Sequence, residues 1–395
     1  MKRTVGSVLL AVVLIASLGG TALGPAAGQA TGSETTVNCT YPIEVTDATG
    51  ATVSVAQEPE DVVVLAPSAA QVMWEIGAQD KVVGMPVRYY TEYLNGSTEK
   101  ENVVGQKGQP ETETIVGLDP DLVLAPNIIS EDAVEKLRNA DITVYRFAQA
   151  ASVADVVEKT QLTGRLVGEY ETAREVSART QATLDAYRNA TADEEQPKVL
   201  YALGGGYTAG SQTFIGDVIE AAGGENVASA ANISGYDVIS NEVIVDEDPD
   251  WIVVPSGGSV PSGPEINQTT AIQEDQVLQV NRNYMNQAGP RVTQPLQQMA
   301  TAFHSDATAD VTVDPASVSA SVCDANAVTT TATETTTATA TDTATDTTTI
   351  DGNVTFQSNQ TMGTTTEPTT TSGPGFGVIG AITALVSAGV VARRR

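Results

Sequence analysis

Acidic side chains recur at one spacing in this chain and are the first candidates for chemistry. Asp119-Pro120-Asp121 and Asp248-Pro249-Asp250 each carry two carboxylates around a proline, a pair that could act as general acid and base in a pocket. Both motifs directly precede runs of apolar residues, and Asp and Pro at such points are typical of turns that lead into buried strands. We therefore interpret both motifs as turns.

The single histidine, His304, restricts the chemistry further. A Ser-His-Asp or Cys-His catalytic site would have to use this residue, and no motif surrounds it. One histidine also excludes a His-rich zinc or manganese site, so we predict no metal centre. Gly204-Gly205-Gly206 follows a predicted strand and could cradle an anion, but it lacks the Lys-Ser/Thr of a nucleotide loop and is interpreted as a tight turn. We predict that the protein is not an enzyme.

Tyrosines between predicted strands are better candidates for a binding role. Flat aromatic side chains that line a cleft suit a large planar or chelate ligand. The alternative is that each ring only anchors its loop against the body of the protein. The candidates are Tyr89, Tyr90, Tyr93, Tyr207 and Tyr236.

An internal repeat carries one glutamate in each half of the chain. Glu113 lies six residues before the first Asp-Pro-Asp motif, Glu242 lies six before the second, and four apolar residues and a proline follow each motif. Such a repeat predicts two units of one architecture with a glutamate at an equivalent place in each. The alternative is that each glutamate only favours its helix N-terminus through the helix dipole.

The elements that would position these residues are two α/β lobes. Strands alternate with helices in residues 41–150 and again in 197–305, which predicts mostly parallel sheets. Between them, apolar residues recur every third or fourth position from Ser152 to about Ala190, with a capping pattern at its start. We predict one bridging helix over 151–192, about 55 Å long, and a ligand cleft between the lobes.

The net charge of the chain limits the kinds of partner that it can bind. The chain has 49 acidic and 20 basic residues, a formal net charge of -29. A surface this acidic repels nucleic acid, so we predict no nucleic-acid partner. It suits very high external salt, where self-repulsion is screened, and this predicts a halophilic source. The alternative is a surface that attracts cations.

The N-terminus is typical of a secretory signal, which we assign to residues 1–30. Lys2 and Arg3 precede an apolar run, and small residues around Ala26 to Ala30 offer a cleavage site. Outside the cell, a disulfide between Cys39 and Cys323, the only two cysteines, would join the ends of the two-lobe body. The alternative is two unpaired thiols.

Sequons and a biased tail predict a glycosylated surface protein. Residues 306–372 form a linker and a Thr-rich stalk that cannot build a core. Residues 373–395 contain Pro374-Gly375-Phe376, an apolar run and three terminal arginines, a candidate anchor that is short for a membrane span. Sequons occur at Asn38, Asn95, Asn189, Asn232, Asn267, Asn353 and Asn359.

Five segments between Tyr41 and about Ser305 carry a family resemblance: Ile43–Gly50, Val63–Ser68, Leu118–Ala125, Ala222–Val227 and Gly289–Arg291. On these segments the chain resembles the periplasmic-binding-protein family with a single-helix hinge, which delivers cobalamin, iron–siderophore complexes or haem to ABC importers. The resemblance implies two Rossmann-like lobes, a cleft ligand, limited hinge motion, and one glutamate per lobe that docks onto the permease, here Glu113 and Glu242. The tail resembles the archaeal PGF-CTERM sorting signal, which implies replacement by a lipid anchor on the outer face of the membrane.

The resemblance leaves several ligands open. Tyr236, with Tyr89 or Tyr90, matches where cobalamin binders hold cleft aromatics, which favours a corrinoid. Arg88, Lys107 and Arg282 are candidates for holding an anionic iron–siderophore, haem is a further alternative, and the paired tyrosines could instead bind ferric ion. We expect no permanently bound cofactor, a monomer, and a permease and ATPase as partners. The alternative of another class is a structural or adhesive surface glycoprotein.

Overall fold

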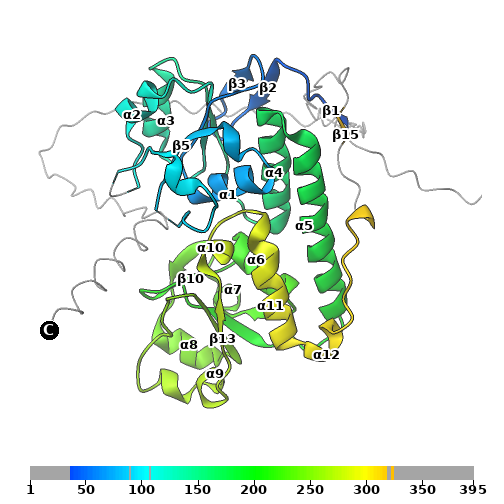
Figure 1. The fold of residues 1–395 in the computed structure, drawn as a ribbon. Coiled ribbons are helices and arrows are strands. Elements are labelled where there is room, and N and C mark those ends of the chain that lie inside the picture. The colour runs from blue at the N-terminus through cyan, green and yellow to red at the C-terminus, as the bar shows by residue number, and fades with distance from the viewer. Residues whose placement is uncertain (1–35, 89, 106–107, 318–321, 324–395) are drawn as a thin grey trace, which may run out of the picture. The chain divides into compact units, whose positions relative to one another are not determined.

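The computed structural model describes residues 36–88, 90–105, 108–317 and 322–323, and it contains two α/β lobes (Figure 1). The predicted signal peptide, the anchor segment and most of the stalk lie outside the described residues. Within the described ranges, no helix combines the length and the apolar character needed to cross a bilayer.

The N-terminal lobe is built on a five-stranded parallel sheet of order β6-β5-β4-β7-β8. Val62 and Val64 of β4 face one core with α1, whereas Val63 faces a second core with α2 and α3. Both faces of the sheet are therefore covered, which explains why its strands are continuous apolar runs. The elements are β4 (Val62–Val64), α1 (Pro67–Glu75), β5 (Val82–Met85), β6 (Glu101–Asn102), α2 (Thr112–Gly117), β7 (Leu122–Ala125), α3 (Glu131–Arg138) and β8 (Val144–Arg146).

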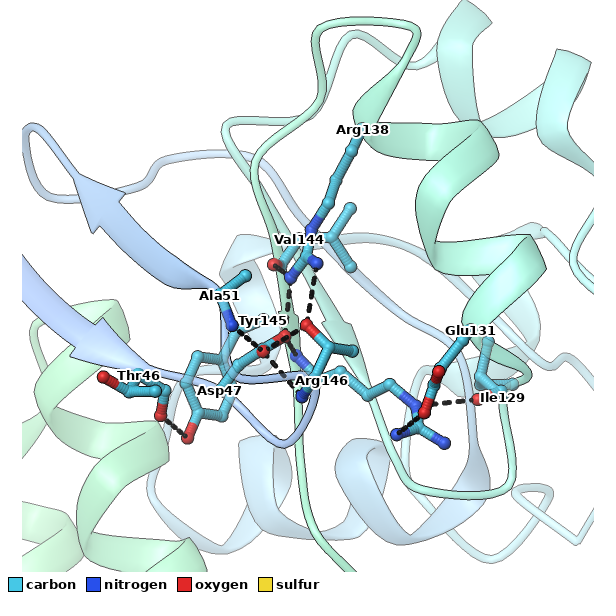
Figure 2. Close-up of polar contacts among 10 residues, drawn as sticks. Thr46, Asp47, Ala51, Ile129, Glu131, Arg138, Val144, Tyr145 and Arg146 are labelled. Carbon is cyan, nitrogen blue, oxygen red and sulfur yellow. Dashed lines mark hydrogen bonds and ion pairs between the residues drawn. The ribbon is translucent and has the colours of Figure 1, made fainter. Parts of the chain in front are cut away.

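An antiparallel hairpin, β2 (Ile43–Thr46) and β3 (Thr52–Val55), is attached to this lobe through the buried Asp47. Oδ2 of Asp47 accepts from Nη2 of Arg138 at 2.5 Å and from the amide of Arg146 at 3.2 Å (Figure 2). Burial alone would raise the pKa of Asp47, but the hydrogen bonds from Thr49, Arg138 and two backbone amides lower it. The carboxylate therefore stays ionised and fixes the hairpin to β8.

The C-terminal lobe repeats this plan with a four-stranded parallel sheet of order β11-β9-β13-β14. Val199 and Tyr201 of β9 face one core, and Leu200 faces the other. The elements are β9 (Lys198–Tyr201), β10 (Tyr207–Ala209), α6 (Phe214–Ala221), β11 (Glu225–Asn226), α7 (Val227–Ala230), β12 (Tyr236–Val238), α8 (Asn241–Glu247), β13 (Trp251–Pro255), α9 (Thr270–Gln273), β14 (Val277–Val280), α10 (Arg282–Met285), α11 (Thr293–Phe303) and α12 (Ser305–Thr308).

The prediction of one continuous bridging helix is wrong. The segment forms two helices, α4 (Val153–Val167) and α5 (Tyr170–Thr191), which lie side by side (Figure 1). They run antiparallel, because Gly164 packs on Ala173 near one end and the hydroxyl of Ser177 donates to the carbonyl of Val157. The bridge is therefore a helical hairpin whose longer helix spans about 33 Å.

Gly168 is the physical reason for the break. It caps α4 in the left-handed region at φ 83°, where L-residues are disfavoured. Gly168 and Glu169 thus interrupt a periodicity that the sequence carries through without a proline. The predicted cap at the other end of α4 is confirmed: Ser152 and Asp155 form a reciprocal capping box.

Each bridging helix packs on both lobes. The C-terminal part of α4 contributes Leu166 to the core of the N-terminal lobe, and its first turn contributes Val153 to the core of the C-terminal lobe. Helix α5 does the reverse, with Ala173 in the first core and Leu184 in the second. Asp217 of α6 joins the two at one end, since it accepts from the amide of Val153 and pairs with Arg188.

The two ends of the body meet in a short parallel pair that sequence reasoning did not predict. Strand β1 (Thr36–Val37) runs beside β15 (Val322–Cys323), with Val37 opposite Cys323. Cys39 is disulfide-bonded, and Cys323 is the only other cysteine in the sequence.

Candidate functional site: the junction of the lobes and the two glutamates

Tyr90 lies where the N-terminal lobe meets the C-terminal lobe. Its backbone has φ 60°, and its carbonyl accepts from Nε2 of Gln287 at 2.9 Å. Cζ of Arg282, at the start of α10, lies 5.9 Å from the centroid of its ring. A cation over an aromatic face is a favourable contact. Tyr90, one of the predicted ligand residues, is therefore already paired with a residue of the opposite lobe.

Arg282 also acts on Tyr201, a buried tyrosine of its own lobe. Burial raises the pKa of Tyr201, while the positive charge of Arg282 opposes this shift. The Tyr201 hydroxyl donates to Oδ1 of Asn286 at 2.5 Å. Burial likewise raises the pKa of Tyr236. Both phenols therefore stay neutral near pH 7. Tyr201 is fully buried and uses its hydroxyl on Asn286, so of these two only the partly exposed Tyr236 is placed to offer a ligand its ring.

Tyr207 and Tyr236 lie on one face of a two-stranded antiparallel ribbon. In the register of β10 and β12, Tyr207 is opposite Val238 and Ala209 is opposite Tyr236. The two tyrosines are thus diagonal neighbours, a relation that leaves long side chains within reach of each other. Tyr236 also packs against the core of its lobe, and Val238 is 53% exposed.

The structure brings Tyr207 together with Tyr236 through the ribbon, and it places Tyr90 beside Arg282. Two other predicted ligand residues, Tyr89 and Lys107, lie outside the described residues.

A second cluster at the junction has its centre at Gln287, which sequence reasoning missed. Oε1 of Gln287 accepts from the hydroxyl of Tyr93 at 2.7 Å and from Nε2 of Gln71 at 3.2 Å. Burial raises the pKa of Tyr93 to about 12, so this hydroxyl acts as a donor. Nothing in the spacing of Gln71 or Gln287 distinguishes either glutamine from a solvent-exposed one.

Arg291 completes the cluster. Its Nε donates to Oε1 of Glu75 at 2.6 Å, and its guanidinium carbon lies 5.1 Å and 5.5 Å from the ring centroids of Tyr93 and Tyr284. The preceding Gly289 allows the close approach of the two lobes, because a Cβ there would lie 2.4 Å from Oε1 of Gln71. The Gly289-Pro290-Arg291 motif was the available sequence signal for this contact.

Glu113 and Glu242 occupy the same position in their two lobes. Each is the second residue of its helix, α2 or α8, and each is exposed. Among the described residues neither glutamate forms an ion pair. Both carboxylates are therefore free to meet a cationic partner.

The Asp-Pro-Asp motifs confirm that the two halves are structurally equivalent. Asp119 and Asp248 both adopt φ 47°. Oδ2 of Asp121 accepts from the amide of Asp61 at 3.0 Å, and Oδ2 of Asp250 accepts from the amide of Lys198 at 2.7 Å. The second aspartate of each motif thus ties its strand to the neighbouring one, which confirms the turn interpretation and leaves neither pair arranged for catalysis.

His304 caps the end of α11, where its Nε2 lies 3.0 Å from the carbonyl oxygen of Gly223. In the described ranges, no three His, Cys, Asp or Glu side chains gather in a way that could hold a metal ion.

The fold and these sites can be compared with known proteins. Residues 62–283, more than half of the sequence, match a family described as periplasmic binding protein. The chain belongs to this family.

Individual relatives agree with this membership. The cobalamin-binding protein of Halobacterium salinarum is 42% identical over 310 residues, which cover 75% of this chain and 83% of that protein. The ABC transporter substrate-binding lipoprotein YvrC of Bacillus subtilis is 26% identical over 321 residues, 78% of this chain and 99% of YvrC. Among solved structures, the periplasmic heme-binding protein RhuT from Roseiflexus sp. RS-1 in apo form has a TM-score of 0.56 at 25% identity, over 63% of this chain and 99% of RhuT.

The comparisons confirm the predicted family and the predicted class, a substrate-binding component of an ABC importer. Periplasmic binding proteins carry solutes to importers outside the cytoplasm, so both the general location and the type of partner follow from membership. The two-lobe α/β fold is confirmed, apart from the doubled bridge described above.

Proposed function

We propose that this periplasmic binding protein captures a corrinoid of the cobalamin type outside the cell and delivers it to the permease and ATPase of an ABC importer. The observation that carries the proposal is the 42% identity to the Halobacterium cobalamin-binding protein over 83% of its length. No permanently bound cofactor and no catalytic step are required.

The chemistry at the junction of the lobes supports this ligand. Tyr90, Tyr207 and Tyr236 offer aromatic faces that suit a planar ring system, and Arg282 adds a cation beside Tyr90. Tyr89 and Lys107 complete the proposed set of ligand residues.

A direct titration tests the ligand. The purified protein at high salt is titrated with cyanocobalamin, haemin and a ferric hydroxamate, and the fluorescence of Trp74 and Trp251 is followed. We expect saturable binding of cyanocobalamin alone or with much higher affinity. Binding of haemin, the ligand in the name of RhuT, without cyanocobalamin would replace the corrinoid. Binding of none of the three would contradict the receptor proposal.

Variants locate the ligand. Arg282→Gln and Tyr90→Ala should each weaken cyanocobalamin binding by about tenfold or more, because they remove a cation and an aromatic face from the junction. Arg179→Gln is the matched control, since Arg179 is exposed on α5, away from the junction. Equal affinity in all three variants would move the site elsewhere.

Glu113 and Glu242 are proposed to dock on arginines of the permease. Their equivalent helix positions, their exposure and their lack of an ion-pair partner among the described residues support this role. The double variant Glu113→Ala/Glu242→Ala should keep its ligand affinity and lose uptake in cells. Glu175→Ala, an exposed glutamate of α5, is the control. Loss of ligand binding in the double variant would assign the two glutamates to the ligand site instead.

The remaining proposals concern the cell surface. We propose an exported, monomeric glycoprotein that is held by a lipid anchor after cleavage within 373–395, with Cys39 bonded to Cys323. Mass spectrometry of the mature protein would detect the processed C-terminus, the glycans and the linked cysteine peptides. An intact Arg393–Arg395 end on the mature protein would exclude the cleavage.

A further inference from the structure

A cavity of about 470 Å³ lies beside the bridging hairpin, and none of its lining residues belongs to the two clusters at the junction. One wall is a single face of α4, a second is the end of β8 with the loop after it, and the first turn of α5 contributes Tyr170. Its volume falls in the range of small-molecule sites. Every lining residue lies between positions 145 and 170, so none belongs to the proposed corrinoid site. The residues that the argument uses are Tyr145, Phe147, Lys159, Leu162, Arg165 and Tyr170.

Two cations line this cavity without an ion pair among the described residues. Lys159 is only 9% exposed, and its Nζ lies 3.4 Å from Oγ of Ser68 and 5.3 Å from the centroid of the Phe147 ring. Nε of Arg165 is buried and has no hydrogen-bond partner in the part of the chain that the structure describes. A buried ammonium or guanidinium without a counter-charge is costly.

The carboxylates nearby do not neutralise these cations. Oδ2 of Asp155 is used by the amides of Ala151 at 2.6 Å and Ser152 at 3.0 Å. Glu158 is exposed at the rim. In a protein with 49 acidic residues, a buried lysine and a half-buried arginine whose Nε is buried face one cavity. Neither forms an ion pair among the described residues, and this arrangement suits an external anion.

The other walls of the cavity indicate the shape and polarity of the rest of the anion. Phe147, Leu162 and the rings of Tyr145 and Tyr170 give the cavity apolar and aromatic surfaces. Tyr145 is held in place, because its hydroxyl donates to the carbonyl of Thr46 at 3.4 Å (Figure 2). Flat rings favour a flat partner.

We propose that this cavity binds a small organic carboxylate with a planar apolar body, its carboxylate held by Lys159 and Arg165 and its ring packed against Phe147 and Tyr145. The site is independent of the corrinoid site, so either proposal can fail without the other.

Proton uptake on ligand binding would identify this site. Burial lowers the pKa of Lys159 to about 8, and a bound carboxylate would raise it again. Binding near pH 8.5 should therefore take up a proton. The other titratable groups that line the cavity are Asp155, Glu158 and Arg165 of α4, Tyr145 of β8 and Tyr170 of α5.

The test is calorimetric titration of the whole protein with benzoate, with neutral benzamide as the uncharged isostere, at constant ionic strength and in two buffers of different ionisation enthalpy. We expect saturable benzoate binding with proton uptake at pH 8.5, and benzamide binding weaker by about tenfold or more. Absence of saturable benzoate binding, or equal binding of the two probes, would overturn the proposal.

Variants distinguish benzoate binding in this cavity from general attraction to positive surface charge. Lys159→Met and Arg165→Gln should each weaken benzoate binding by about tenfold or more, and Lys159→Met should also abolish the proton uptake. Ala148→Trp, at the exposed rim, should block entry without touching the buried groups. Arg179→Gln, which removes an exposed cation of α5 that does not line the cavity, is the control and should bind benzoate normally. Unchanged binding in Lys159→Met, Arg165→Gln and Ala148→Trp would contradict the assignment.

Discussion

Arg291 and Glu75 join the two lobes by a hydrogen-bonded ion pair of 2.6 Å, with the guanidinium also facing the rings of Tyr93 and Tyr284. Both side chains are about three-quarters buried. The pair is therefore largely shielded from solvent, where an ion pair contributes more than at a free surface.

The first prediction concerns this pair. Arg291→Met should lower the free energy of unfolding by about 2 kcal/mol, because it leaves the Glu75 carboxylate without its partner. Denaturant unfolding of Arg291→Met, Glu75→Gln and the double variant gives the coupling energy. We expect a coupling of at least about 1 kcal/mol, and additive effects would show that the contact contributes little.

The second prediction concerns acid stability. The folded protein holds the pKa of Asp47 below its ordinary value of 3.8, so the unfolded chain binds this proton at higher pH. The stabilisation is full above about pH 5 and is lost as the pH falls through the lowered folded pKa. Asp47→Asn should cost about 2 kcal/mol at pH 7, and the difference from wild type should vanish in strong acid. A difference that does not change with pH would contradict this role.

The third prediction concerns Lys159, whose replacement should stabilise the protein at pH 7, whereas replacement of Asp47 should destabilise it. Because burial lowers the pKa of Lys159 from 10.5 to about 8, the unfolded state binds more protons between these values, and stability rises with pH in that window. In the absence of a bound anion, Lys159→Met should therefore raise the free energy of unfolding at pH 7 by roughly 1–3 kcal/mol. Thermal unfolding at pH 7 and pH 10.5 checks this: the gain should shrink at the higher pH.

The fourth prediction concerns the turn between the bridging helices. Gly168→Ala should destabilise the protein by about 1–2 kcal/mol, because φ is +83° and a Cβ would approach Cδ of Glu58 to 2.5 Å. Gly117→Ala at the end of α2 is the control, since nothing lies within 4 Å of its Cβ. A loss of stability as large in the control would remove the conformational explanation.

Much of the fold could be predicted from patterns of local residues. The continuous apolar runs Val62–Ala66 and Leu122–Ala125 lie at the centre of the first sheet, and the hairpin around Asp47 is present. The repeated Asp-Pro-Asp motif correctly predicted equivalent turns with a common φ of 47° at Asp119 and Asp248. In these cases the structure-forming contacts are close in sequence or follow from one hydrophobic period.

The features that could not be predicted share a physical cause: they depend on contacts between residues that are far apart in the sequence. Helical periodicity continues across Gly168, so only the packing of Gly164 on Ala173 reveals the reversal of the chain. Gln71 and Gln287 bind each other across the lobes although neither carries a local signal. Lys159 was part of the helical pattern, and its burial depends on the position of Phe147 beyond a loop.

The helical hairpin constrains the mechanics of the protein. Two helices packed along their length resist bending within the plane that contains both helix axes. They bend more easily out of that plane. Because α4 and α5 are each anchored in both cores, the lobes share one compliant axis, perpendicular to the helices and lying in the plane of the hairpin. Lobe motion on ligand capture should therefore be a small rotation about that axis, with little twist.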